Sequence, residues 1–145
     1  MTSASRLKEL DKRSLVTSAL RAWNRGDLDA FAAHVSDDVA WLEVSGRPEG
    51  DSREAYGRER LRRSLASLFE AWESYRLDIE EVRDAGDRVL AIVREVARGR
   101  ASGVEVESRW GYVISVEEGQ IVRIEAYRDP DLAAQRASGG AATQL

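Results

Sequence analysis

The spacing of apolar residues predicts two helices near the start of the chain, joined by a tight corner. The first helix runs from Asp11 and buries one stripe, formed by Leu15, Val16, Ala19, Leu20 and Trp23. Gly26 fits a left-handed helix end, because glycine has no Cβ to oppose that conformation. Asp27 fits the N-cap of the second helix, whose apolar face is formed by Leu28, Phe31, Ala32 and Val35.

One short strand and a third helix are predicted after this corner. The strand spans 39–45, and the stretch 46–57, which contains three glycines and a proline, is typical of a loop. The third helix has an apolar stripe formed by Leu61, Leu65, Leu68, Phe69 and Trp72. A helix with a single apolar face needs a second layer to cover it, so we expect this helix to lie on a sheet.

The second half of the chain changes to a period of two, which is typical of strands. β-branched residues recur, often alternating with charged ones, in four segments: 74–83, 88–98, 105–116 and 120–128. Short Gly-containing turns at 84–87 and 117–120, with a third connection at 99–103, predict an antiparallel meander. Asp129-Pro130 ends the last strand, and one or two helical turns follow. The predicted fold class is therefore α+β.

Composition supports a single domain and narrows the set of partners. A chain of 145 residues can enclose one core, which we assign to 10–137, with flexible ends at 1–9 and 138–145. A net charge of −4 gives no overall attraction for nucleic acid or anionic lipid, so we expect neither as a partner. The chain has no apolar run of membrane-spanning length and no segment that resembles a secretory signal, so we predict a cytoplasmic protein.

The residues that usually bind metals are scarce. The chain has no cysteine, which excludes disulfides, thiolate nucleophiles and sulfur-ligated metals. Its single histidine, His34, falls near the end of the second helix, where an exposed or partly exposed histidine favoured by the helix dipole explains it better than catalysis does. We therefore expect no metal site and no cofactor.

The order of elements and three motifs, NRGDLDAF, DDVAW and EEGQIVRIEAYRDP, resemble the NTF2-like superfamily, and more narrowly its SnoaL-like polyketide cyclase and ketosteroid isomerase branch. The resemblance covers about residues 10–137. It implies a cone, in which a strongly curved antiparallel sheet wraps around the three helices of the N-terminal half and encloses an apolar pocket for a small molecule. It also implies a homodimer formed through the outer faces of the sheets.

Glu43 is the first candidate catalytic residue. By alternation it shares a face of its strand with Val39 and Trp41. On a face that lines a cavity, its carboxylate could remove a proton next to a carbonyl group. The resemblance places Glu43 where ketosteroid isomerases carry their catalytic aspartate. The alternative is a structural carboxylate near the rim, solvated or paired with Arg47 or Arg109.

Tyr112 is the second candidate. The resemblance places it where the isomerases carry an acidic group that donates a hydrogen bond to the developing oxyanion, and a phenol could take this role. The alternative is an aromatic side chain that fills the pocket. The predicted pocket lining is completed by Trp41, Trp110, Ile114, Val122, Ile124, Ala126 and Arg128, the last near the mouth.

One position departs from the isomerase pattern. The main oxyanion donor of the isomerases is a tyrosine on the first helix, and the matching residue here is Ala19. Steroid isomerisation itself is therefore not predicted. Two hypotheses remain. One is a cofactor-free enzyme of the isomerase or cyclase type that transfers a proton on an apolar carbonyl compound, and the other is a non-catalytic module that binds an apolar ligand or a partner.

Overall fold

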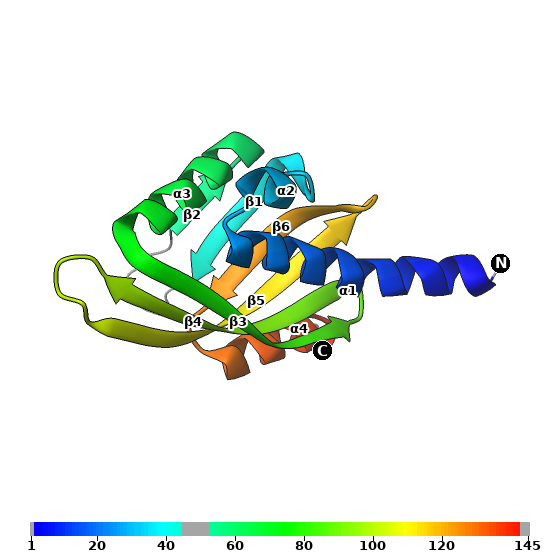
Figure 1. The fold of residues 1–145 in the computed structure, drawn as a ribbon. Helices are drawn as coiled ribbons and strands as arrows, with labels where there is room; N and C mark the ends of the chain where they lie inside the picture. Colours follow the sequence, from blue (N-terminus) through cyan, green and yellow to red (C-terminus); the bar gives the residue numbers. More distant parts are fainter. Residues whose placement is uncertain (1, 45–52, 143–145) are drawn as a thin grey trace.

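The computed structural model describes residues 2–44 and 53–142 (Figure 1). Its elements, in chain order, are α1 (Thr2–Arg25), α2 (Leu28–Ala32), β1 (Val35–Val44), β2 (Arg53–Tyr56), α3 (Arg58–Ala71), β3 (Trp72–Ala85), β4 (Arg88–Gly99), β5 (Glu105–Glu117), β6 (Gln120–Tyr127) and α4 (Pro130–Ala142). The strands form one sheet in the order β2-β1-β6-β5-β4-β3. The pairing of β1 with β6 is parallel and the other pairings are antiparallel. The predicted α+β cone is confirmed.

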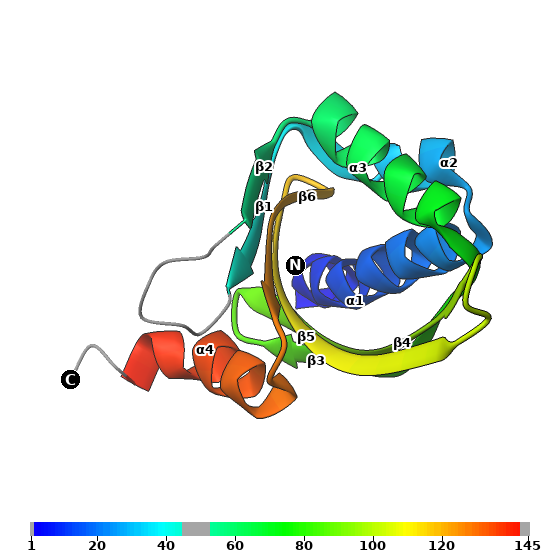
Figure 2. The same cartoon turned by 90° about the vertical axis from the view of Figure 1, so that its left-hand side faces the viewer.

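The curved sheet separates two apolar clusters. Helices α1, α2 and α3 lie on its concave side, whereas α4 lies on the convex side (Figure 2). The main core fills the concave side and includes Val16, Trp23, Phe31, Leu65, Val93 and Ile114. The smaller outer cluster joins the sheet to α4 and is formed by Leu90, Ile92, Val113, Tyr127, Ala133 and Ala137. Helix α4 therefore covers part of the face through which the resemblance implied a homodimer, and that dimer stays a prediction.

The corner between α1 and α2 forms as predicted. Gly26 has a φ of +74°, and the N–H groups of Gly26 and Asp27 donate to the carbonyls of Trp23 and Ala22 at 2.9 and 3.0 Å. The Asp27 side chain accepts a hydrogen bond from the Ala30 N–H at 3.1 Å. The second helix is shorter than predicted, because it ends at Ala32 and Val35 already belongs to β1.

The four predicted strands of the second half are confirmed to within two residues at each end. Two local predictions were wrong. The expected loop contains the short strand β2, which pairs with β1 and could not be recognised from four residues alone. Trp72 does not lie on the helical stripe of α3, because its backbone is extended, at φ −110° and ψ 146°, and begins β3.

Both ends of the chain carry more helix than predicted. α1 begins at Thr2, and no glycine or proline interrupts the chain before Arg25. α4 begins at Pro130, beside Asp129, whose side chain accepts a hydrogen bond from the Asp131 N–H at 3.0 Å. It continues to Ala142 instead of ending near residue 137. Within the described ranges, no helix is both long enough and apolar enough to cross a membrane.

Asn24 ties the edge of the sheet to α1. Its side-chain oxygen accepts a hydrogen bond from the Leu77 N–H at 2.8 Å, and β3 is an edge strand. We expect Asn24→Ala to lower the free energy of unfolding by about 1–2 kcal/mol, because the Leu77 N–H loses its partner. Urea denaturation would measure the change. Asn24→Asp keeps the acceptor and should cost less, so equal losses in both variants would contradict this role.

Candidate functional site

Glu43 and Tyr112 lie in one row across the concave face of the sheet. Ala126 on β6 pairs with Glu43 on β1 and with Tyr112 on β5, and Tyr112 pairs with Ala91 on β4. Since neighbouring strands are about 4.8 Å apart, the two Cα atoms are about 10 Å apart. The residue between them is a buried alanine, so no large side chain of β6 separates the carboxylate from the phenol.

Three aromatic rings surround this row. Trp23 of α1 stacks on Tyr112 with ring centroids 5.8 Å apart and an interplanar angle of 21°. Trp41 of β1 contacts both rings, each at 5.7 Å between centroids. The rings give the interior an aromatic wall, and they also occupy part of the space that an open pocket would need.

Tyr112 is held as a neutral phenol. It is only 3% exposed, and burial raises its pKa well above the ordinary value, with the carboxylates of Glu95 and Glu43 raising it further. A protonated phenol is a hydrogen-bond donor at neutral pH. Two carboxylates, one on β1 and one on β4, therefore both raise the pKa of the same hydroxyl group.

Glu95 and Tyr75 form a polar pair that sequence reasoning missed. The Tyr75 hydroxyl donates a hydrogen bond to Glu95 at 2.6 Å, and the Ser108 hydroxyl lies 3.5 Å from the other carboxylate oxygen. Burial, Tyr112 and Glu95 raise the pKa of Tyr75 above its usual range. A signal was present in the sequence, because Glu95 alternates with Val89, Ala91 and Val93 as Glu43 does with Val39 and Trp41.

Two indole N–H groups of the interior lack an acceptor. The Nε1 atoms of Trp23 and Trp110 are buried without a well-formed hydrogen bond among the described groups, although the Trp23 N–H lies close enough to the Tyr75 hydroxyl to lower the pKa of that phenol. A buried donor left unpaired costs about 1–3 kcal/mol, so a ligand oxygen or a water molecule at these positions would be stabilising. The guanidinium of Arg128, which is exposed, lies 5.0 Å from the centroid of the Trp110 ring.

The structure brings most of the predicted lining residues into one core. Trp110, Tyr112, Ile114, Ile124 and Ala126 are buried members, and Trp41 packs against them. Val122 is not a member. The β5–β6 pairing shifts register between Ser115 and Val116, so that Val116 pairs with Ile121 and Ser115 with Arg123. Ile121 thereby takes the buried position predicted for Val122, which is half-buried.

Of the two arginines expected beside Glu43, only Arg109 lies within the described residues, and it contacts a different carboxylate. Arg109 pairs with Glu80 at 2.9 Å, and Arg47 lies outside the described residues. The register of β1 and β2 instead sets Arg53 opposite Glu43. The Glu43 side chain is half-buried on the concave side of β1, where Trp41 also packs.

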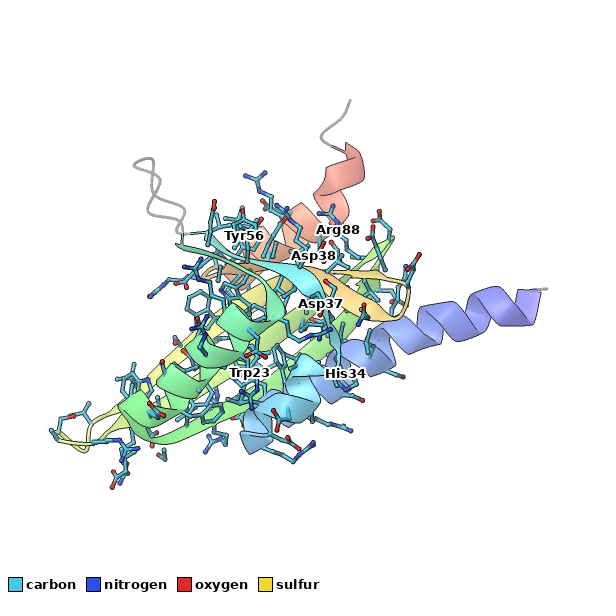
Figure 3. The ribbon with its side chains drawn as sticks, turned by 90° about the horizontal axis from the view of Figure 1, so that it is seen from above. Trp23, His34, Asp37, Asp38, Tyr56 and Arg88 are labelled. Atoms are coloured by element: carbon cyan, nitrogen blue, oxygen red, sulfur yellow. The ribbon has the colours of Figure 1, made fainter. Side chains whose placement is uncertain are left out.

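The structure also places the two remaining candidate positions, His34 and Ala19, and the acidic side chains. His34 is half-buried between α2 and β1, away from Trp23 (Figure 3). Its carbonyl accepts a hydrogen bond from the Ile121 N–H at 2.8 Å. Ala19 is buried in the core on α1 and offers no donor. Over the described segments, no three Asp, Glu or His side chains are placed to hold a metal ion.

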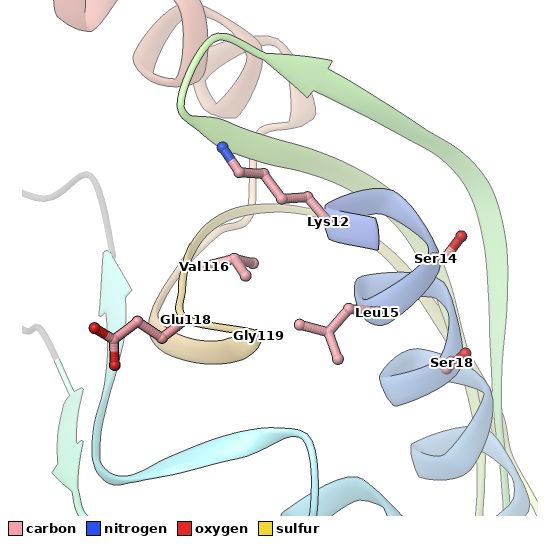
Figure 4. Close-up of a pocket in the computed structure, with 7 residues that line it drawn as sticks. All are labelled: Lys12, Ser14, Leu15, Ser18, Val116, Glu118 and Gly119. Atoms are coloured by element: carbon pink, nitrogen blue, oxygen red, sulfur yellow. The ribbon is translucent and has the colours of Figure 1, made fainter. Parts of the chain in front are cut away.

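A separate cavity borders α1 and the β5–β6 turn (Figure 4). It has a volume of about 600 Å³. Its lining residues are Lys12, Ser14, Leu15, Ser18, Val116, Glu118 and Gly119. Glu43 and Tyr112 are not among them, so this cavity is distinct from the row of predicted site residues.

The fold is a cone, and its concave interior is lined by aromatic side chains. The family model of the SnoaL-like domain matches residues 16–124, and the chain therefore belongs to the SnoaL-like domain family. A comparison with curated proteins finds no match.

Solved structures share the fold. An NTF2-like protein from Burkholderia thailandensis superposes with a TM-score of 0.70 at 27% identity, over 86% of this chain and 95% of that one. A protein from Xanthomonas campestris, provisionally named a polyketide cyclase, gives 0.66 at 26% identity, over 87% and 96% of the two chains. AclR from Streptomyces galilaeus, provisionally named a hydroxylase, gives 0.66 at 18% identity over 81% and 87%, which shows the fold alone.

Proposed function

We propose that this protein binds a small, apolar carbonyl compound inside the cone and transfers a proton on it. Glu43 is the base that removes a proton next to the carbonyl group, and Tyr112 donates a hydrogen bond to the oxygen on which negative charge develops. The observation that carries the proposal is the shared row of Glu43 and Tyr112, with only Ala126 between them.

The surroundings of this row support the proposal. The raised pKa of Tyr112 keeps its proton in place for donation. The unpaired indole N–H groups of Trp23 and Trp110 offer further contacts to ligand oxygens. The rings of Trp23 and Trp41 favour an apolar ligand that can contact aromatic side chains. The provisional name of the Xanthomonas protein, a polyketide cyclase, is compatible with chemistry on a carbonyl compound.

One observation favours a second candidate function, ligand binding without catalysis. Tyr112 is buried and in contact with Trp23 and Trp41, so a substrate can reach its hydroxyl only if neighbouring side chains move. A non-catalytic protein needs no such access to the hydroxyl. The two functions therefore differ in whether a bound carbonyl compound exchanges protons.

The test uses 2-tetralone, an apolar ketone with acidic protons next to its carbonyl group. We expect the full-length protein in D₂O to accelerate exchange of these protons, followed by proton NMR. Glu43→Gln should slow the exchange by about 10²-fold, because the amide cannot accept the proton. Tyr112→Phe should slow it by up to about 10²-fold through loss of the donor. Glu107→Gln, which changes an exposed carboxylate paired with Arg94, is the matched control.

A binding measurement separates the two functions. 2-Naphthol resembles the enol of 2-tetralone, and its binding can be followed by quenching of tryptophan fluorescence. Binding of 2-naphthol without any exchange of 2-tetralone would favour the non-catalytic function. Exchange that persists unchanged in Glu43→Gln would show that Glu43 is not the base.

A further inference from the structure

Two hollows lie on either side of one ridge of α1. The larger, of about 600 Å³, is the cavity between α1 and the β5–β6 turn (Figure 4). The smaller, of about 390 Å³, is lined by Arg13, Ser14, Thr17, Ser18, Arg21 and Val82. Ser14 and Ser18, one helical turn apart, line both hollows. A ligand could therefore extend across this ridge from one hollow into the other.

The two hollows differ in chemistry. Leu15 and Val116 line the larger hollow, and both are half-buried and pack against the main core. Its apolar part thus rests on side chains that the fold holds in place. The smaller hollow instead combines the guanidinium groups of Arg13 and Arg21 with three hydroxyl groups. Together they offer an apolar surface beside a group of cationic donors.

The charges around α1 give a ligand one favoured orientation. The chain has a net charge of −4, yet Lys12, Arg13 and Arg21 gather here. Arg13 contacts Asp84 at 3.5 Å, with both side chains well exposed, and no ion pair among the described residues involves Lys12 or Arg21. Glu118 extends from the opposite side of the larger hollow (Figure 4). An anionic group would therefore lie on the arginine side, away from Glu118.

We infer that the two hollows together bind an amphipathic carboxylate. Its head group lies between Arg13 and Arg21, because guanidinium groups match a carboxylate with paired N–H donors. Its apolar chain crosses the Ser14–Ser18 ridge and covers Leu15 and Val116. This site shares no lining residue with the Glu43 and Tyr112 row, so it does not depend on the proposed function.

The test is titration of octanoate into the ¹⁵N-labelled full chain, followed by two-dimensional NMR. We expect shifts at residues 12–21 and 116–119 and smaller ones around Tyr112. Arg21→Gln should weaken octanoate binding by about tenfold, since one charged hydrogen-bonding contact is lost. Arg63→Gln, an exposed arginine on α3, is the matched control and should have no effect.

Two further variants separate the head group from the chain. Val116→Thr keeps the shape of the side chain, and it should weaken octanoate and the uncharged 1-octanol alike. Glu118→Gln should strengthen octanoate binding by about twofold, because a nearby negative charge is removed. Equal affinity for octanoate and 1-octanol, no effect of Arg21→Gln, or shifts confined to the residues around Tyr112 would each overturn the proposal.

Discussion

Replacing Gly111 with alanine is expected to lower the free energy of unfolding by about 2–4 kcal/mol, although alanine is otherwise tolerated in strands. A Cβ atom at this position would clash with the Cβ of Ala133 and lie 3.2 Å from the Cα of Pro130. The second contact is with backbone, so α4 must move away from the sheet. That movement would open the outer cluster around Leu90 and Val113. Urea denaturation of both proteins measures the loss.

Ala133→Gly provides the matched control. Alone it should cost about 1 kcal/mol through its helix propensity. Combined with Gly111→Ala it removes the nearer of the two clashing atoms, so the double variant should be more stable than the sum of the single effects predicts. Strict additivity of the two losses would show that α4 does not pack on Gly111 as described.

Stability is expected to fall steeply as the pH rises above 10. Burial and the hydrogen bond to Glu125 raise the pKa of Tyr127 from 10.0 to about 12, and burial raises those of Tyr75 and Tyr112. Between these pH values the unfolded chain has lost protons that the folded chain keeps. Unfolding then releases protons and becomes more favourable as the pH rises. Each tyrosine should contribute about 1.4 kcal/mol per pH unit, or about 4 kcal/mol per unit for the three.

This loss can be assigned to the tyrosines because the chain has only two lysines, Lys8 and Lys12, to titrate in the same range. Denaturation in urea at a series of alkaline pH values gives the slope, and near-ultraviolet absorbance reports tyrosinate formation. Tyr127→Phe should remove about one third of the slope, since one of three groups no longer titrates. An unchanged slope in this variant, or ionisation in the folded protein near pH 10 of more than the one exposed tyrosine, Tyr56, would contradict the expectation.

Local sequence determined the secondary structure and the inward face of most strands. Apolar periodicity and the Gly26–Asp27 corner depend on neighbours within a few residues, and the structure has the three N-terminal helices and four long strands they predict. Alternation along β1 and β5 put Glu43 on the same face as Trp41, and Tyr112 on the same face as Trp110, before any pairing was known.

Only the tertiary structure decided how these faces meet. The register shift in β6 buries Ile121 in place of Val122, and β2 exists through its pairing with β1. The pairing of β3 with β4 and the curvature of the sheet bring Tyr75 to Glu95, while Gly111 allows α4 to approach the convex face. Register, bulges and curvature arise from contacts between residues distant in the chain, whereas periodicity reports only which side of its own strand a residue occupies.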